Sequence, residues 1–148
     1  LFMKDGVLFS HGDLCFSNII FNESENEITF IDPRGAEGSE VYKTPYYDLA
    51  KISHSILGGY DLIVNNVSSI EFDKNMNAYL DLNKSLTYNS EKIFTKFVEG
   101  LGYNMKLVKI IEASLFVTML PLHTDDIKKI TMLSLRASEL LGQLSKQS

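Results

Sequence analysis

The residues best suited to chemistry lie in the segment 11–18, which reads His-Gly-Asp-Leu-Cys-Phe-Ser-Asn, and in the segment 31–34, Ile-Asp-Pro-Arg. Asp13 is followed by Asn18 five positions later and by Asp32 fourteen positions after that. In phosphoryl transfer, one Asp accepts the proton of the attacking hydroxyl, while an Asn and a second Asp hold the magnesium ions that neutralise the phosphates. The types and spacing of these three residues therefore predict a phosphoryl-transfer site.

Each of these side chains also has a purely structural interpretation. Asp13 could stabilise a turn after Gly12, Asn18 could end a loop by bonding to backbone, and Asp32 could cap the loop that follows an apolar strand. The combination of all three favours the chemical interpretation. Asp13 and Asp32 would repel each other in one site unless a cation lay between them, so this interpretation implies metal dependence.

A β-hairpin is expected to position the two metal ligands. Residues 18–22 and 27–32 are strand candidates, and the polar residues 23–26 between them are typical of a turn. Antiparallel pairing would return Asn18 and Asp32 to the same end of the ribbon. The hairpin thus suits two ligands that share metal ions.

The rest of the chain is mainly helical in pattern, so we predict an α+β fold that is mainly α, with the small hairpin followed by a helical bundle. A short buried strand at 7–10 leads into the motif, and a loop covers 35–44, next to Pro45. In the middle of the chain we expect a helix at 46–57 stopped by Gly58-Gly59, one or two helical turns at 60–67 and a strand at 78–82. Two further helices are expected, one from Glu91 to about 101 capped by Ser90 and one at 104–120 ended by Pro121. A last helix is expected to run to about 144, capped by Thr124 and with Asp125 and Asp126 in its first turn.

Composition limits the classes of function. The chain has 148 residues, enough for one domain or part of one, and its net charge of -5 argues against a nucleic-acid partner. No apolar run is long enough to cross a bilayer, so membrane insertion is not expected. The single cysteine, Cys15, excludes an intrachain disulfide and fits a reducing compartment, and the start lacks a secretion signal. These features predict a cytoplasmic protein.

The order of motifs resembles the aminoglycoside phosphotransferase and choline kinase family, which has a protein-kinase-like fold. The resemblance covers residues 8–57, about a third of the chain, and includes a Tyr-Asp-Leu-Ala segment at 47–50 that opens a helix. It implies an ATP- and Mg²⁺-dependent kinase that phosphorylates a hydroxyl of a small molecule. Its roles for these residues are Asp13 as catalytic base, Asn18 and Asp32 as metal ligands, and His11 and Asp48 as supports of the catalytic loop.

Two departures from the family pattern bear on the site. Cys15 stands where many members have a second His, and we interpret it as a small buried hydrophobe. After Asp32 the chain has Pro33-Arg34-Gly35, where Arg34 could clamp a phosphate or could pair with Glu37 or Glu40. The Asp-Pro-Arg-Gly form resembles a subgroup associated with bacterial capsule or surface-polysaccharide synthesis.

The nucleotide-binding part of such a kinase is not found in this sequence. We interpret 1–148 as part of a kinase-like C-terminal lobe, with the catalytic loop, hairpin and metal loop in 1–45 and the helical part in 46–148. The N-terminal lobe is expected in the full-length protein. A non-catalytic binding or interaction module with a kinase-like shape is the alternative.

The acceptor is not specified by the sequence. Four aromatic side chains near the motif could stack on a sugar or surround an amine, or could belong to the core: Phe16, Tyr42, Tyr46 and Tyr47. His54 and His123 have no metal-ligand spacing, so no chemistry is assigned to them.

Overall fold

The computed structural model describes residues 3–4, 7–8, 10–34, 44–82 and 88–146. It confirms the coarse class, α+β and mainly helical. The α-helices are α1 (Pro45–Ile56), α2 (Tyr60–Val64), α3 (Tyr88–Gly100), α4 (Met105–Met119) and α5 (Ile127–Ser145), with 3₁₀ turns η1 (Phe16–Asn18) and η2 (Leu120–His123). The strands form three antiparallel pairs: β1 (Met3–Lys4) with β2 (Val7–Leu8), β3 (Ile19–Asn22) with β4 (Glu27–Phe30), and β5 (Ser69–Phe72) with β6 (Ala78–Asp81).

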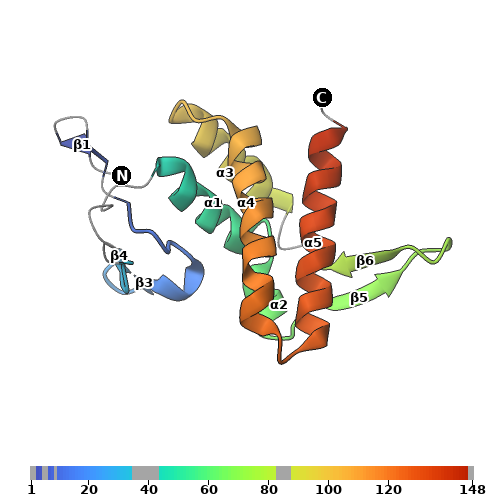
Figure 1. Ribbon diagram of the computed structural model, residues 1–148. Helices are drawn as coiled ribbons and strands as arrows, with labels where there is room; N and C mark the ends of the chain where they lie inside the picture. Colours follow the sequence, from blue (N-terminus) through green and yellow to red (C-terminus); the bar gives the residue numbers. More distant parts are fainter. Residues whose placement is uncertain (1–2, 5–6, 9, 35–43, 83–87, 147–148) are drawn as a thin grey trace.

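Helices α1, α4 and α5 form the body of the molecule, and the hairpins lie at its two sides (Figure 1). The β3–β4 hairpin and the N-terminal segment lie beside α1, whereas the β5–β6 hairpin extends from the side of α5. Helix α4 packs against both α1 and α5. The residues of the predicted site are therefore carried by the hairpin side and supported by α1.

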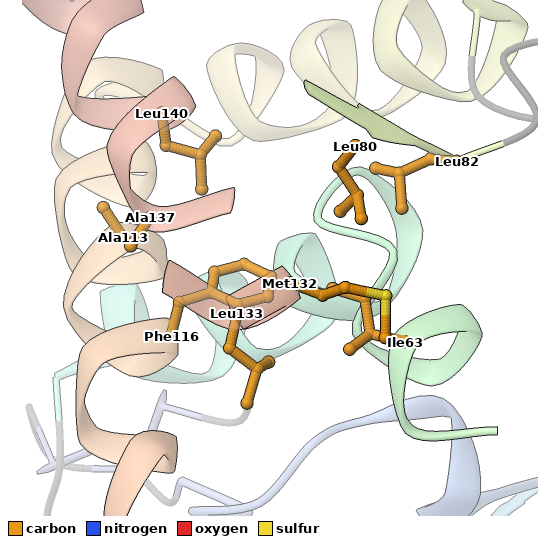
Figure 2. Packing of buried hydrophobic residues seen from close by; sticks show 9 residues of the cluster. All are labelled: Ile63, Leu80, Leu82, Ala113, Phe116, Met132, Leu133, Ala137 and Leu140. Atoms are coloured by element: carbon orange, nitrogen blue, oxygen red, sulfur yellow. The ribbon is translucent and has the colours of Figure 1, made fainter. Parts of the chain in front are cut away.

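Two clusters of buried apolar side chains hold the helices together. One joins α4 and α5 to α2 and β6, with Phe116, Met132 and Leu133 fully buried (Figure 2). The other joins α1, α3 and α4 through residues such as Leu49 and Val98. Fully burying one such side chain contributes about 1.5–3 kcal/mol. Because α4 contributes to both clusters, it fixes the position of α1, and with it the floor of the site.

The β3–β4 hairpin confirms the predicted geometry of the ribbon. Ile19 pairs with Phe30, and the amide of Ile31 donates to the carbonyl of Asn18 over 3.0 Å. Asn18 and Asp32 consequently lie at the same end of the hairpin, as expected. Both faces of this ribbon are largely open, and four of its apolar side chains are more than half exposed: Ile20, Phe21, Ile28 and Phe30.

Two predicted helix caps are wrong. Helix α3 begins at Tyr88, so Ser90 lies inside its first turn instead of capping it. The cap of α5 is Asp126, whose carboxylate accepts from the amide of Lys129, and Thr124 belongs to the turn before it. Ser, Thr and Asp are all good caps, so the local composition of 124–126 does not select among them.

The predicted strand at 78–82 is present as β6, but its partner β5 was not expected. Ser69–Phe72 pairs with it, and the carboxylate of Asp73 closes the connecting turn by accepting from the amides of Asn75 and Asn77. Four residues give too short an alternation of polar and apolar side chains to identify a strand by itself.

No helix in the described part of the chain combines the length and the apolar character that crossing a membrane requires.

Candidate functional site

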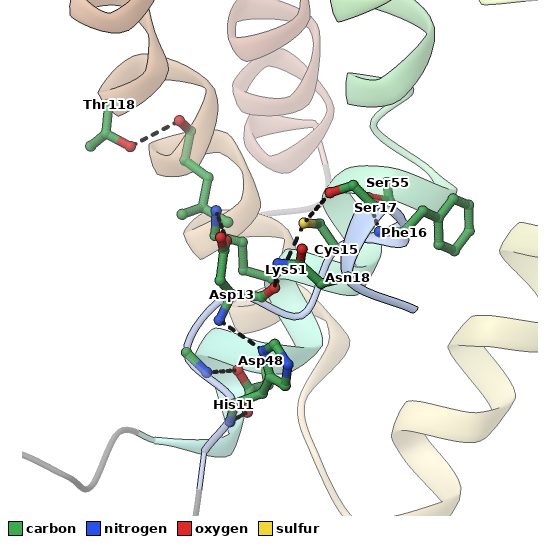
Figure 3. A network of polar contacts seen from close by, with 12 residues as sticks. His11, Asp13, Cys15, Phe16, Ser17, Asn18, Asp48, Lys51, Ser55 and Thr118 are labelled. Atoms are coloured by element: carbon green, nitrogen blue, oxygen red, sulfur yellow. Dashed lines mark hydrogen bonds and ion pairs between the residues drawn. The ribbon is translucent and has the colours of Figure 1, made fainter. Parts of the chain in front are cut away.

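Asp48, at the start of α1, holds the backbone of the segment before Asp13. Its carboxylate accepts from the hydroxyl of Ser10 at 2.8 Å, from the amide of His11 at 2.7 Å and from the amide of Gly12 at 2.9 Å (Figure 3). Asp48 is 3% exposed, so these bonds form away from water. Hydrogen bonds to a charged acceptor are about twice as strong as neutral ones. The loop is therefore fixed to the helix immediately before the candidate base.

The carboxylate of Asp13 forms an ion pair that was not predicted from the sequence. The ammonium of Lys51, one turn along α1 from Asp48, lies 2.8 Å from Oδ1 of Asp13. Lys51 is only 8% exposed, whereas the Asp13 side chain retains 26% of its exposure. The signal was available: residues three apart on a helix share a face, so Lys51 lies on the same side as Asp48.

Asn18 contacts Asp13 through the backbone. The amide nitrogen of the Asn18 side chain donates to the carbonyl oxygen of Asp13 over 2.8 Å. Asn18 is buried, and no hydrogen bond to its Oδ1 atom is found among the described residues. The amide group is thus oriented by its nitrogen while its oxygen, the atom that can bind a cation, keeps its lone pairs.

Cys15 is buried, as predicted, and lies within the loop. Its sulfur lies 3.2 Å from the hydroxyl of Ser17 and 3.6 Å from the carbonyl oxygen of Asp13. The amide of the next residue, Phe16, donates to the hydroxyl of Ser55 on α1 over 3.2 Å. Helix α1 thus supports the loop on both sides of Asp13.

His11 connects the loop to the segment that carries Asp32. Its Nε2 lies 3.0 Å from the carbonyl oxygen of Ile31, and the amide of Asp13 donates to its Nδ1 over 3.4 Å. Since Nδ1 accepts, the ring proton belongs on Nε2, which then donates to Ile31. The amide of Arg34 donates to the carbonyl of His11 over 2.9 Å.

Asp32 itself has an unusual backbone conformation. Its φ angle is 54°, in the left-handed region that non-glycine residues seldom occupy and in which Asp is tolerated better than most. Its side chain is exposed, and so is that of Arg34. Such conformations are concentrated at functional sites. The two possible partners of Arg34, Glu37 and Glu40, lie outside the described residues.

The predicted aromatic residues divide into different environments. The ring of Tyr46 packs edge-on against Tyr103 with centroids 5.2 Å apart, and its hydroxyl accepts from the amide of Asn104. Tyr46 and Tyr47 pack against the cluster of α1, α3 and α4, which supports the core interpretation for both. Phe16 is 47% exposed and contributes to a surface cavity. Tyr42 lies outside the described residues.

This cavity of about 590 Å³ adjoins the loop that carries Asp13. Phe16 and Ser55, which are hydrogen bonded to each other, lie in its wall, and the other side is made by α3. Its lining is mainly apolar. The most polar group is Asp61, whose Oδ2 atom is buried without a hydrogen-bond partner in the described structure. Cavities of this size commonly hold small molecules.

His54 is buried within the helical bundle. Its ring stacks on Tyr60 with centroids 4.4 Å apart and lies 4.0 Å from the ring of Phe116. Burial, together with the charges of Lys51 and Arg136, lowers the pKa of His54 to about 3. His54 is therefore neutral at physiological pH.

No group of three or more His, Cys, Asp or Glu side chains in the described ranges is arranged to hold a metal ion. The predicted metal ligands, Asn18 and Asp32, are only two residues and include an Asn, so they are not a group of this kind.

Comparison with family models, with curated proteins and with solved structures finds no significant match to this chain.

Proposed function

We propose that this chain carries the catalytic half of an ATP- and Mg²⁺-dependent phosphotransferase that acts on a hydroxyl group of a small molecule. Asp13 accepts the proton of the attacking hydroxyl, and Asn18 and Asp32 hold the metal. The acceptor is a sugar, an amino alcohol or a precursor of a surface polysaccharide. This proposal requires a nucleotide-binding lobe in the full-length protein.

The observation that carries the proposal is the way in which the Asp13 loop is held. Asp48 fixes the two amides before Asp13, and the Asn18 side chain fixes the carbonyl of Asp13 itself. None of these bonds uses the carboxylate of Asp13. A general base must be positioned within hydrogen-bond reach of the proton that it removes, and a rigid loop that leaves its carboxylate free of backbone bonds achieves this.

The residues present suit a magnesium ion. Mg²⁺ prefers oxygen ligands and is usually held by one or two protein groups together with substrate phosphates and water. Asn18 offers an oriented amide oxygen, and Asp32 an exposed carboxylate at the same end of the hairpin. When bound, the ion would neutralise phosphate charge. Because the carboxylates of Asp13 and Asp32 would repel each other in one site, the site requires a cation. Asn18 and Asp32 are the residues that would hold this cation.

We place the acceptor in the cavity beside Phe16. Phe16 follows Asp13 by three residues, and its amide bond to Ser55 fixes the cavity wall to the same helix that holds the loop. The apolar lining would contact the body of the acceptor, and Asp61 would accept a hydrogen bond from a polar group on it.

The test is the substitution Asp13→Asn in the protein expressed from the complete gene. ADP release would be measured with ATP, Mg²⁺ and a panel of sugars and amino alcohols. We expect turnover to fall by at least about 10²-fold, the usual contribution of a general base. Asp125→Asn is the matched control, because Asp125 is exposed and lies in the turn before α5. Equal turnover of Asp13→Asn and wild type would refute the assignment.

One observation favours the alternative, a non-catalytic module with a kinase-like shape. The ammonium of Lys51, 2.8 Å from Oδ1 of Asp13, already occupies one oxygen of the candidate base and competes there with an acceptor hydroxyl. The two functions differ in one measurable respect. A module without activity would show no acceptor-dependent ADP release from the complete protein, with any acceptor in the panel, and Asp13→Asn would change nothing.

A further inference from the structure

A second cavity, of about 420 Å³, lies between the helices. Its lining residues are separate from those of the proposed catalytic loop. Its walls come from the end of α1, from β6 and from α3, α4 and α5. One side of the cavity is apolar and is made by Leu57, Leu80, Leu82 and Leu140. The wall also includes Tyr79 and Gln143. No residue of the segment 10–34 contributes to it. The size lies within the range of small-molecule sites.

The charged residues of this cavity pair with one another, with one exception. The ammonium of Lys109 lies 2.9 Å from Glu91, and the guanidinium of Arg136 lies 3.0 Å from Glu139. The remaining donors of Arg136 bind the carbonyls of Leu57 and Gly58, and Glu139 also accepts from the amide of Leu80. Three carboxyl groups therefore face two cations, and the unpaired one is Glu112.

Glu112 is fully buried and only half satisfied. Its Oε2 accepts from the hydroxyl of Ser53 over 2.6 Å, whereas no partner for Oε1 is found in the described part of the chain. Leaving a buried polar atom without a partner is unfavourable, and more so when the group is charged. Burial also raises the pKa of Glu112, and the hydrogen bond from Ser53 and the charges of Arg136 and Lys109 offset this only in part. The cavity thus lacks one positive hydrogen-bond donor.

We propose that this cavity binds a small molecule with one ammonium group and an apolar body, the ammonium donating to Oε1 of Glu112 and the body packing on the leucine side. The single unpaired carboxyl sets the charge of the ligand at one. A second charged group on the ligand would lie against the leucine side chains without a partner, so the ligand is expected to have an apolar body.

This site is separate from the proposed catalytic site. Lys51 and Ser53 are two positions apart on α1, so their side chains leave the helix on nearly opposite sides. Lys51 contacts Asp13, and Ser53 contacts Glu112. The amine ligand is therefore not the acceptor, and the proposal does not depend on phosphotransferase activity.

The test compares cyclohexylamine, protonated at neutral pH, with cyclohexanol, which has nearly the same shape and no charge. Titrations of the ¹⁵N-labelled chain would be followed by amide chemical shifts. We expect the amine to shift amides around Glu112, Arg136 and Leu57 and to bind at least about tenfold more tightly than the alcohol. In Glu112→Gln this preference should disappear. Glu99→Gln, a carboxylate change on the exposed side of α3, should leave it intact.

Three results would overturn the proposal: no binding of the amine, equal binding of amine and alcohol, or an unchanged preference in Glu112→Gln. Should Glu112→Gln fail to fold, Gln143→Trp decides the matter. Gln143 is exposed in the cavity wall, so this change blocks the cavity without disturbing the core. Loss of amine binding in Gln143→Trp supports the proposal, and retained binding contradicts it.

Discussion

At the scale of single residues, the pairing of Asp13 with Lys51 is the feature on which the proposed chemistry depends. A buried ammonium beside a candidate base stabilises the carboxylate and fixes its position. Lys51 has little exposure of its own, so in the absence of Asp13 it would remain a buried cation without its partner. Removing one partner of such a pair costs more than the pair contributes, because the other charge stays desolvated.

We expect Lys51→Met and Asp13→Asn to be strongly non-additive in stability. Each change alone should shift the free energy of unfolding, with about 1 kcal/mol or more of coupling between them in a double-mutant cycle measured by urea denaturation. The control is Lys109–Glu91, a pair whose carboxylate is half exposed and whose coupling should stay below about 1 kcal/mol. Additive effects at Asp13 and Lys51 would show that their contact contributes nothing in solution.

At the scale of elements, the end of α1 is fitted closely against α4. A Cβ atom at Gly58 would lie 2.8 Å from both the Glu112 carboxylate and the ring of Phe116, and 2.5 Å from the carbonyl oxygen of His54. The absence of a side chain at this position lets the two helices approach each other. The Gly58-Gly59 stop was predicted from the sequence as a helix end, but the close approach behind it was not.

Gly58→Ala should therefore lower the free energy of unfolding by about 1–3 kcal/mol, the usual cost of overpacking a core. Gly100→Ala is the matched control, because a Cβ there meets nothing within 4 Å and alanine favours helix over glycine. In thermal unfolding, the midpoint temperature of Gly58→Ala should fall below that of wild type. The midpoint temperature of Gly100→Ala should stay the same or rise. A Gly58→Ala protein as stable as wild type would contradict the described packing.

The buried His54 between α1, α2 and α4 makes stability depend on pH. Its pKa is about 3 in the folded chain and about 6.5 when unfolded, so between these values the unfolded state binds an extra proton. The contribution is complete above pH 6.5 and is lost as pH falls, at up to about 1.4 kcal/mol per pH unit. From pH 7 to pH 5, wild type should lose about 2 kcal/mol more than His54→Gln in urea denaturation. Equal losses would show that His54 is protonated in the folded chain.

The sequence predicted the elements better than their ends and their contacts. The helical spacing of 46–57 and 104–120 identified α1 and α4 almost to the residue, because their apolar faces repeat over several turns. Ser90 and Thr124 were assigned as caps by residue type alone, which tertiary structure overrides. The helix face that Lys51 shares with Asp48 was a usable signal, but the sequence has no local pattern that identifies Asp13, so far away in the chain, as the partner of Lys51.

On the scale of the whole molecule, the two sides of α1 differ in how well they are held. Helices α4 and α5 pack over their length and share a buried cluster, whereas the β3–β4 hairpin keeps both faces exposed. Local opening costs least where few apolar groups are buried. Asp32, the proposed metal ligand, therefore lies on the less stable side of the molecule.

Hydrogen exchange followed by mass spectrometry should reveal this difference. Peptides from Ile19–Phe30 should exchange at least about tenfold faster than peptides from the middle of α4 and α5, because a two-stranded hairpin without a buried face is marginally stable. The peptide of β5–β6 is the internal control, since Leu80 is buried in the α4–α5 cluster. Protection of the β3–β4 hairpin equal to that of α4 would contradict the described exposure.

The contacts of α1 with the loop occur in the same order along both segments. Asp48 binds the amides of His11 and Gly12, Lys51 binds Asp13, and Ser55 binds the amide of Phe16. The contacts of the loop are thus in register with those of the helix. Each residue added to a helix rotates all later side chains by about 100° around the helix axis. A single-residue insertion between 49 and 54 would break this alignment, whereas one in the turn at 23–26 would leave it intact. The lengths of the loop and of this part of the helix can therefore change during evolution only together.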